Sequence, residues 1–172
     1  MVLCHGLDAP DQGCQAMGAN GRRQGAAAEQ LSYTLGEPKL VIRAAGQYGR
    51  RGGNLHRALG RAYLDLDRPE DAMHEFGRAL RLCPKFHDIR LELAKLLRLR
   101  GNAHGAREEL TLILQLDPEH HDARALLGVI EIETGDRKEG LQHLRAVVER
   151  CADHPVAQAY LQQADSDYQR AS

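Results

Sequence analysis

Apolar residues recur along most of this chain with a period of about 34 residues, a length typical of helical repeat proteins. Pro84 and Pro118 stand at equivalent places, and the segments to which they belong, 53–86 and 87–120, carry apolar side chains at matching positions. A further step of the same length gives the segment 121–154 without any insertion. A fixed period of this kind is the signature of a repeat protein, in which each copy folds as one small structural unit.

Within each copy, the apolar spacing predicts two short amphipathic helices. In the first copy one apolar stripe runs over 55–66 and a second over 72–82, each with the spacing of one helix face. The break between them, 67–69, contains a proline, which is favoured in the first turn of a helix. Gly101 and Gly135 mark the same break in the next two copies. We therefore expect an all-α fold built from helix pairs.

The matching positions resemble the tetratricopeptide repeat, a helix–turn–helix unit with a W-x2-L-G-x2-Y … A-x3-F … P pattern. In the first copy His56 replaces the opening aromatic, and the rest of the pattern stands at Leu59, Gly60, Tyr63, Ala72, Phe76 and Pro84. The second copy matches at Leu93, Ala94, Leu97, Ala106, Leu110 and Pro118. The third copy departs from the pattern, with Glu131 in the place of Tyr, Gly140 in that of Ala and Ala152 in that of Pro.

This resemblance implies a right-handed α-α superhelix, a solenoid of helix pairs whose concave groove is lined by the first helix of each pair. Members of the family typically bind peptides in that groove, so a non-catalytic interaction module is expected. No nucleophile motif or phosphate loop in the sequence points to an enzyme or a cofactor. His120 and His121 are adjacent, which is a poor arrangement for a metal site, because zinc ligands must converge on one ion.

The period also divides the chain into segments. The first 25 residues are rich in Gly, Ala, Gln and Asn, and such a segment has too little apolar surface to offset the entropy of ordering. Terminal repeats are commonly atypical, because one of their faces meets solvent. We predict a disordered tail at 1–25, a degenerate capping pair at 26–52, repeats at 53–86, 87–120 and 121–154, and a polar capping helix at 155–172.

The candidate partner-binding residues are those that line the groove in the family. Placed by their offset from the Leu-Gly pair, they are Asn54, Arg57, Arg61, Leu64, Asp88, Leu91, Glu92, Lys95, Arg98, Asp122, Leu126, Val129, Ile132 and Tyr160. Some members of the family clamp the C-terminal carboxylate of a chaperone tail with Lys, Asn and Arg in this groove. Glu92 and Asp122 would repel a carboxylate, so we do not expect chaperone-tail binding here.

Two strips of uniform character run through this set. The basic strip consists of Arg57, Arg61, Lys95 and Arg98, and the apolar strip consists of Leu126, Val129, Ile132 and Tyr160. A partner with an acidic stretch followed by an apolar helix or strand would match both strips, because exposed apolar surface commonly marks a contact site. Alternatively, the basic strip is a solvated face with local pairs to Asp65, Asp88 and Glu92. A separate alternative for the apolar strip is that it is core, covered by the last helix.

Composition narrows the class of partner and the cell compartment. The net charge is −1 and aromatic residues are only 4%, which argues against a nucleic-acid partner. No run of 18 apolar residues is present, so no membrane span is expected. Cys83 and Cys151 occupy equivalent places two repeats apart, on the order of 20 Å, which is too far for a disulfide. We therefore expect reduced thiols in a cytoplasmic protein.

Two functions stay open from the sequence alone. The first is a cytoplasmic scaffold or adaptor that holds a peptide or domain of another protein in the groove. The second is a structural protein that self-associates into a homo-oligomer, through its ends or through the apolar strip. The polar character of 155–172 disfavours end-to-end stacking, so the first function is preferred.

Overall fold

The structure is a computed structural model that describes residues 52–171 of the chain. These residues fall into two compact units, 52–96 and 97–171. The expected tail at 1–25 and the expected capping pair at 26–52, apart from its last residue, lie outside the described residues.

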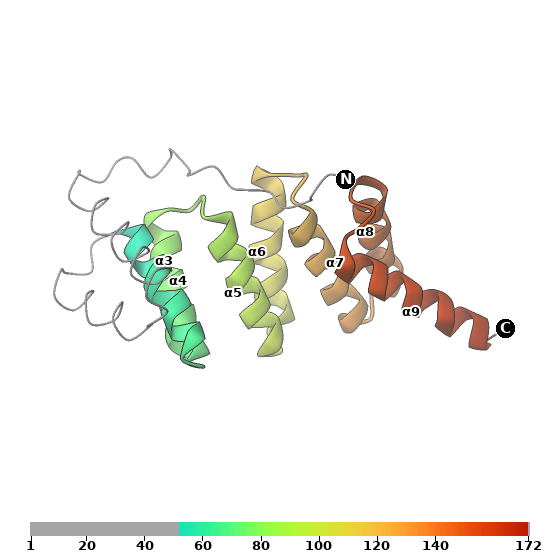
Figure 1. Cartoon of the computed structure of the whole chain (residues 1–172), viewed down its shortest axis with the longest axis horizontal. Helices are drawn as coiled ribbons and strands as arrows, with labels where there is room; N and C mark the ends of the chain where they lie inside the picture. The colour runs from blue at the N-terminus through green and yellow to red at the C-terminus, as the bar shows by residue number, and fades with distance from the viewer. Residues whose placement is uncertain (1–51, 172) are drawn as a thin grey trace. The chain divides into compact units, whose positions relative to one another are not determined.

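Every regular element in the described part of the chain is an α-helix (Figure 1). Unit 52–96 contains α3 (Gly53–Asp65), α4 (Pro69–Leu82) and most of α5 (His87–Leu99). Unit 97–171 contains the end of α5, followed by α6 (Ala103–Leu116), α7 (His121–Thr134), α8 (Arg137–Arg150) and α9 (Pro155–Ala171). The expected all-α fold is therefore confirmed, while the division into numbered repeats stays a prediction.

The local sequence explains where α4 and α6 begin. Pro69 stands at the first position of α4, and Glu70 and Asp71 lie in its first turn. Proline needs no hydrogen-bond partner there, and acidic side chains complement the positive end of the helix dipole. At the start of α6 the side chain of Asn102 accepts a hydrogen bond from the backbone N–H of Gly105 at 3.0 Å, which satisfies one of the free donors of the first turn.

Two histidines in the turns between helix pairs also cap helices. The Nδ1 atom of His120 accepts a hydrogen bond from the backbone N–H of Ala123 at 3.2 Å, at the start of α7. His154 accepts in the same way from Ala157 at 3.3 Å, at the start of α9. His154 follows His120 by one full period of the repeat, so a histidine at the same position of the period caps the following helix in both cases.

In unit 52–96 the core forms where α3 packs against α4. Leu59, Ala72, Phe76 and Ala79 are completely buried. A Cβ atom added to Gly60 would collide with the ring of Phe76. Gly60 thus lets the two helices approach closely enough for the phenylalanine to fill the space between them.

In unit 97–171 the helices α7 and α8 cross at a very short distance. A Cβ atom added to Gly128 would lie 2.7 Å from the carbonyl oxygen of Gly140, and one added to Gly140 would collide with the carbonyl oxygen of Gly128. The backbones of the two helices are therefore in direct contact. The helix α9 extends this core, in which Ala125, Val129, Leu144, Val147 and Ala157 form one buried cluster.

The two cysteines in the described part of the chain are both buried. Cys83 is 4% exposed and Cys151 is 2% exposed, and each of them is disulfide-bonded. The expectation of reduced thiols is therefore wrong at these two positions.

No described helix combines the length and the apolar character that a membrane crossing requires.

Candidate functional site

In unit 52–96, charged side chains bridge the two first helices, α3 and α5. The Nη2 atom of Arg61 donates to the Oδ2 atom of Asp88 at 2.8 Å, and the Nη1 atom of Arg57 lies 3.3 Å from the same oxygen. The guanidinium carbon of Arg57 is also 5.2 Å from the centre of the Phe86 ring, within the range of a cation–π contact. The carboxylate of Asp88 is thus shared by the guanidinium groups of Arg57 and Arg61, and all three side chains are partly exposed.

The remaining predicted residues of this unit divide between surface and core. Lys95 donates to Glu92 at 2.8 Å, one turn away on the same helix, a type of exposed pair that contributes little to stability. Asn54 and Leu64 are half-buried. Leu91 is only 7% exposed, so in this structure it belongs to the core rather than to the surface.

In unit 97–171, an ion pair joins the end of α5 to α7. The Nε atom of Arg98 donates to the Oε2 atom of Glu133 at 2.8 Å, and its Nη2 atom donates to Oε1 at 2.6 Å. This hydrogen bonding is the main reason that the pKa of Glu133 is lowered and that of Arg98 is raised. The fork of the guanidinium matches the carboxylate, which makes the pair geometrically specific.

The four residues of the apolar strip differ in how deeply they are buried. Val129 is 1% exposed and lies in the buried cluster, while Ile132 and Tyr160 are partly buried and pack against that cluster. Leu126 is half-buried. The alternative reading of the strip as core therefore describes Val129, which α8 and α9 cover, whereas Leu126 keeps part of its side chain at the surface.

The last predicted residue, Asp122, is exposed at the start of α7. Its Oδ1 atom lies 3.0 Å from the Nε2 atom of His154. Because the Nδ1 atom of His154 accepts the capping hydrogen bond from Ala157, its Nε2 atom carries the proton and donates to Asp122. The contact thus links the start of α7 to the start of α9.

All four residues of the basic strip have a carboxylate within ion-pair distance: Asp88 for Arg57 and Arg61, Glu92 for Lys95 and Glu133 for Arg98. The charges of the basic strip are therefore paired, while Leu126, Ile132 and Tyr160 of the apolar strip stay partly exposed. Within residues 52–171, no three His, Cys, Asp or Glu side chains converge as metal ligands do.

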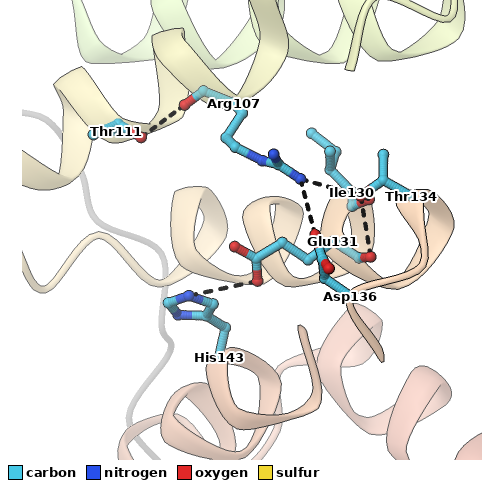
Figure 2. Close-up of polar contacts among 7 residues, drawn as sticks. All are labelled: Arg107, Thr111, Ile130, Glu131, Thr134, Asp136 and His143. Carbon is cyan, nitrogen blue, oxygen red and sulfur yellow. Dashed lines mark hydrogen bonds and ion pairs between the residues drawn. The ribbon is translucent and has the colours of Figure 1, made fainter. Parts of the chain in front are cut away.

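A polar cluster between α6, α7 and α8 was not among the predicted site residues. Figure 2 shows Glu131 of α7 pointing toward His143 of α8, with Arg107 of α6 directed to the end of α7. Glu131 is 7% exposed, and burial is the main reason that its pKa is raised. The signal was present in the sequence, because Glu131 stands where the repeat pattern has an aromatic residue.

A second buried polar pair links α3 and α4. The Nδ1 atom of His56 lies 2.5 Å from the Oε2 atom of Glu75, and both residues are almost completely buried. Arg78 approaches the other oxygen of Glu75 at 3.4 Å. His56 replaces the aromatic residue that opens the repeat pattern, and its partner on the facing helix could not be read from the period.

Comparison with known families and structures identifies what the chain is similar to. Two family models, both described as tetratricopeptide repeat, match residues 53–96 and 97–164. Together they cover well over half of the chain, and the boundary between them coincides with the boundary between the two units. No curated protein matches the sequence significantly.

Several solved structures share the fold. One is YrrB, a protein of this repeat type with an unusual peptide-binding site (TM-score 0.71, 21% identity, 81% of this chain and 73% of that chain). Another is PilF of Pseudomonas aeruginosa (TM-score 0.69, 17% identity, 86% and 71%). A third is the first such domain of Spaghetti bound to the HSP90 peptide SRMEEVD (TM-score 0.62, 14% identity, 70% and 94%). At these identities the likeness shows the fold alone, and it confirms the expected class.

Proposed function

Because the chain belongs to the tetratricopeptide repeat family, we propose that it is a non-catalytic scaffold or adaptor that binds a segment of another protein. The binding residues lie on the first helices, α3 and α5 in one unit and α7 and α9 in the other. Repeats of this kind present extended open surfaces. Among the similar structures, YrrB has a peptide-binding site and the Spaghetti domain holds a peptide.

The observation that carries the proposal is the shared carboxylate of Asp88. Its Oδ2 atom receives both Arg57 and Arg61, and the Arg61 side chain stays 36% exposed beside it. A guanidinium group offers several donors in a rigid fork, which suits a second carboxylate. An acidic side chain of the partner is therefore the chemistry that fits unit 52–96.

Unit 97–171 favours a different contact. Its charged groups Arg98 and Glu133 neutralise one another, while Leu126 and Tyr160 are half-buried and Val156 is 42% exposed. Such side chains favour an apolar residue of the partner over a charged one. An acidic stretch followed by an apolar segment would match the two surfaces.

The test is capture of partners from an extract of the protein's own cells, using the tagged full chain. Arg61→Glu probes one unit and Leu126→Asp probes the other. Arg145→Glu is the matched control, because Arg145 is exposed on α8, a second helix. We expect a partner that Arg145→Glu retains and that the two probe variants lose. Equal retention by all three variants would exclude the first-helix surfaces.

The peptide SRMEEVD provides a second test, because it is the ligand of a structure with the same fold. We predict no measurable binding by fluorescence polarisation at micromolar protein. Glu92 and the exposed Asp122 are negative where a clamp for a carboxylate requires neutral or positive groups. Tight binding of this peptide would show that the chain does hold a chaperone tail and that the expected repulsion by Glu92 and Asp122 is wrong.

Self-association is the alternative function, and it stays a prediction to be tested by mass at increasing protein concentration. The cytoplasmic location is also a prediction. Disulfides are rare in cytosolic proteins, and Cys83 and Cys151 each take part in one. Cell fractionation therefore tests the predicted compartment directly.

A further inference from the structure

Glu131 is an acidic residue in a position that the repeat pattern fills with an apolar or aromatic side chain. The first copy has Tyr63 there and the second has Leu97. Glu131 is 7% exposed, and its Oε2 atom is buried without a hydrogen bond. A buried carboxylate without full hydrogen bonding is costly, since the charge has lost water and gained no equivalent partner.

The neighbouring charges relieve only part of this cost. The Nε2 atom of His143 lies 3.5 Å from Oε2 of Glu131, too far for a good hydrogen bond. Arg107 donates instead to the Oγ1 atom of Thr134 at 3.1 Å and lies 3.7 Å from Asp136. Figure 2 shows this arrangement, with the guanidinium group directed to the end of α7.

The helices cannot easily separate to admit water at this place. The crossing of α7 and α8 brings the backbones of Gly128 and Gly140 into direct contact. Glu131 is one turn of α7 beyond Gly128, and His143 is one turn of α8 beyond Gly140. The carboxylate is therefore held beside the backbone contact between α7 and α8.

We propose that the helix pair α7–α8 is a proton-sensitive element, in which protonation of the buried Glu131 carboxylate on acidification stabilises the packing of the two helices. The groups that face Glu131 are Arg107 from α6, His143 and Glu139 from α8, and Asp136 from the turn between α7 and α8.

The direction of the effect follows from linkage. Burial raises the pKa of Glu131, and the charges of His143 and Arg107 offset only part of this rise. A carboxyl group with a raised pKa binds more protons when folded than when unfolded, over the range between the two pKa values. The stability of α7–α8 therefore falls as the pH rises through that range, and it increases on mild acidification.

The inference does not depend on the proposed function, because it concerns helix packing alone. The same helix carries Leu126 and Glu133, two of the residues near the candidate surface. A change in the local stability of α7 would therefore also change how well these two side chains are held in place.

The experiment is amide hydrogen exchange of the full chain between pH 5 and pH 8, corrected for the intrinsic exchange rate. In the natural sequence, the protection of amides in α7 and α8 should increase several-fold from pH 8 to pH 5, relative to those in α3 and α4. Glu131→Gln should abolish this dependence and raise protection at pH 8. Glu149→Gln, an exposed position on α8, should leave the dependence intact.

Two further variants keep the test decisive. Glu131→Leu places at this position the residue type that the second copy has at Leu97, and it should behave like Glu131→Gln even if the amide variant folds poorly. His143→Ala removes a group that lowers the pKa of Glu131, so the dependence should extend to higher pH. Protection in α7 and α8 that does not change with pH, or that still changes in both Glu131 variants, would overturn the proposal.

Discussion

Arg98 and Glu133 form a two-pronged ion pair between α5 and α7, with donor–acceptor distances of 2.8 and 2.6 Å. The residues are 35 positions apart, one period plus one residue, so the pair joins the first helices of two consecutive copies. Both side chains stay partly exposed, which means that the pair orders the surface without being part of the core.

Replacing Glu133 by Gln should lower the free energy of unfolding by about 0.5 to 1 kcal/mol, the range of exposed pairs with good geometry. Urea unfolding at low and high salt measures it, and the loss should shrink at high salt because screening weakens the natural pair. The pKa of Glu133 is lowered by Arg98. The contribution of Glu133 to the free energy of unfolding is therefore present at neutral pH, and it is lost as the pH falls through the pKa of Glu133 in the folded state.

The control for this prediction is the double variant that combines Glu133→Gln with Arg98→Gln. If the pair acts as described, the two single changes are not additive, and the second change costs little once the first is made. Additive losses would show that the two side chains act independently. The pH dependence also has the opposite sign to that expected for Glu131, so the two carboxyl groups can be told apart.

Replacing Gly60 by Ala should destabilise unit 52–96 by about 1 to 3 kcal/mol, the usual cost of overpacking a core. The added Cβ atom would collide with the ring of Phe76, which is completely buried and has no space to move into. Thermal unfolding followed by circular dichroism measures the effect.

Gly77→Ala is the matched control for Gly60, because both glycines lie within helices. The nearest atom to a Cβ on Gly77 would be 3.8 Å away, an ordinary contact with the flexible end of Arg81. Alanine is favoured over glycine in a helix interior by about 0.5 to 1 kcal/mol, so this change should stabilise the protein. If both alanine variants were stabilised, the close approach at Gly60 would be wrong.

Replacing Val129 by Ala should cost about 2 kcal/mol, from two buried methylene equivalents and the cavity that they leave. Leu126→Ala removes a larger side chain, but Leu126 is only half-buried, so its cost should be smaller. Denaturant unfolding of the two variants gives the comparison. A larger loss for Leu126 than for Val129 would contradict the division of the apolar strip into core and surface.

The sequence predicted the helix pairs well, because their signals are local. The apolar spacing over 55–66 and 72–82 corresponds to α3 and α4, which begin and end within a few residues of those stripes. Gly135 takes a left-handed backbone conformation, with φ of 104°, directly after α7. Glycine adopts that conformation at little cost, and the break was therefore visible without the structure.

The candidate site was only partly predictable. Arg61 and Asp88 were both named from their offset in the repeat, and the structure joins them. The pairing of His56 with Glu75 and of Glu131 with His143 was not predicted. Each of these pairs joins two helices, and its formation depends on how far each helix is rotated about its axis, which a period in the sequence does not specify.

The sequence by itself determined the family, the all-α class and the approximate positions of the helices within residues 53–154, because these depend on the spacing of apolar residues and on Gly and Pro at the breaks. Only the tertiary structure decided that Val129 is core, that the residues of the basic strip are paired with carboxylates, and that Cys83 and Cys151 each take part in a disulfide rather than being free thiols. The physical reason is that burial and charge pairing are set by the neighbouring helices that cover a residue, and those neighbours come from other parts of the chain.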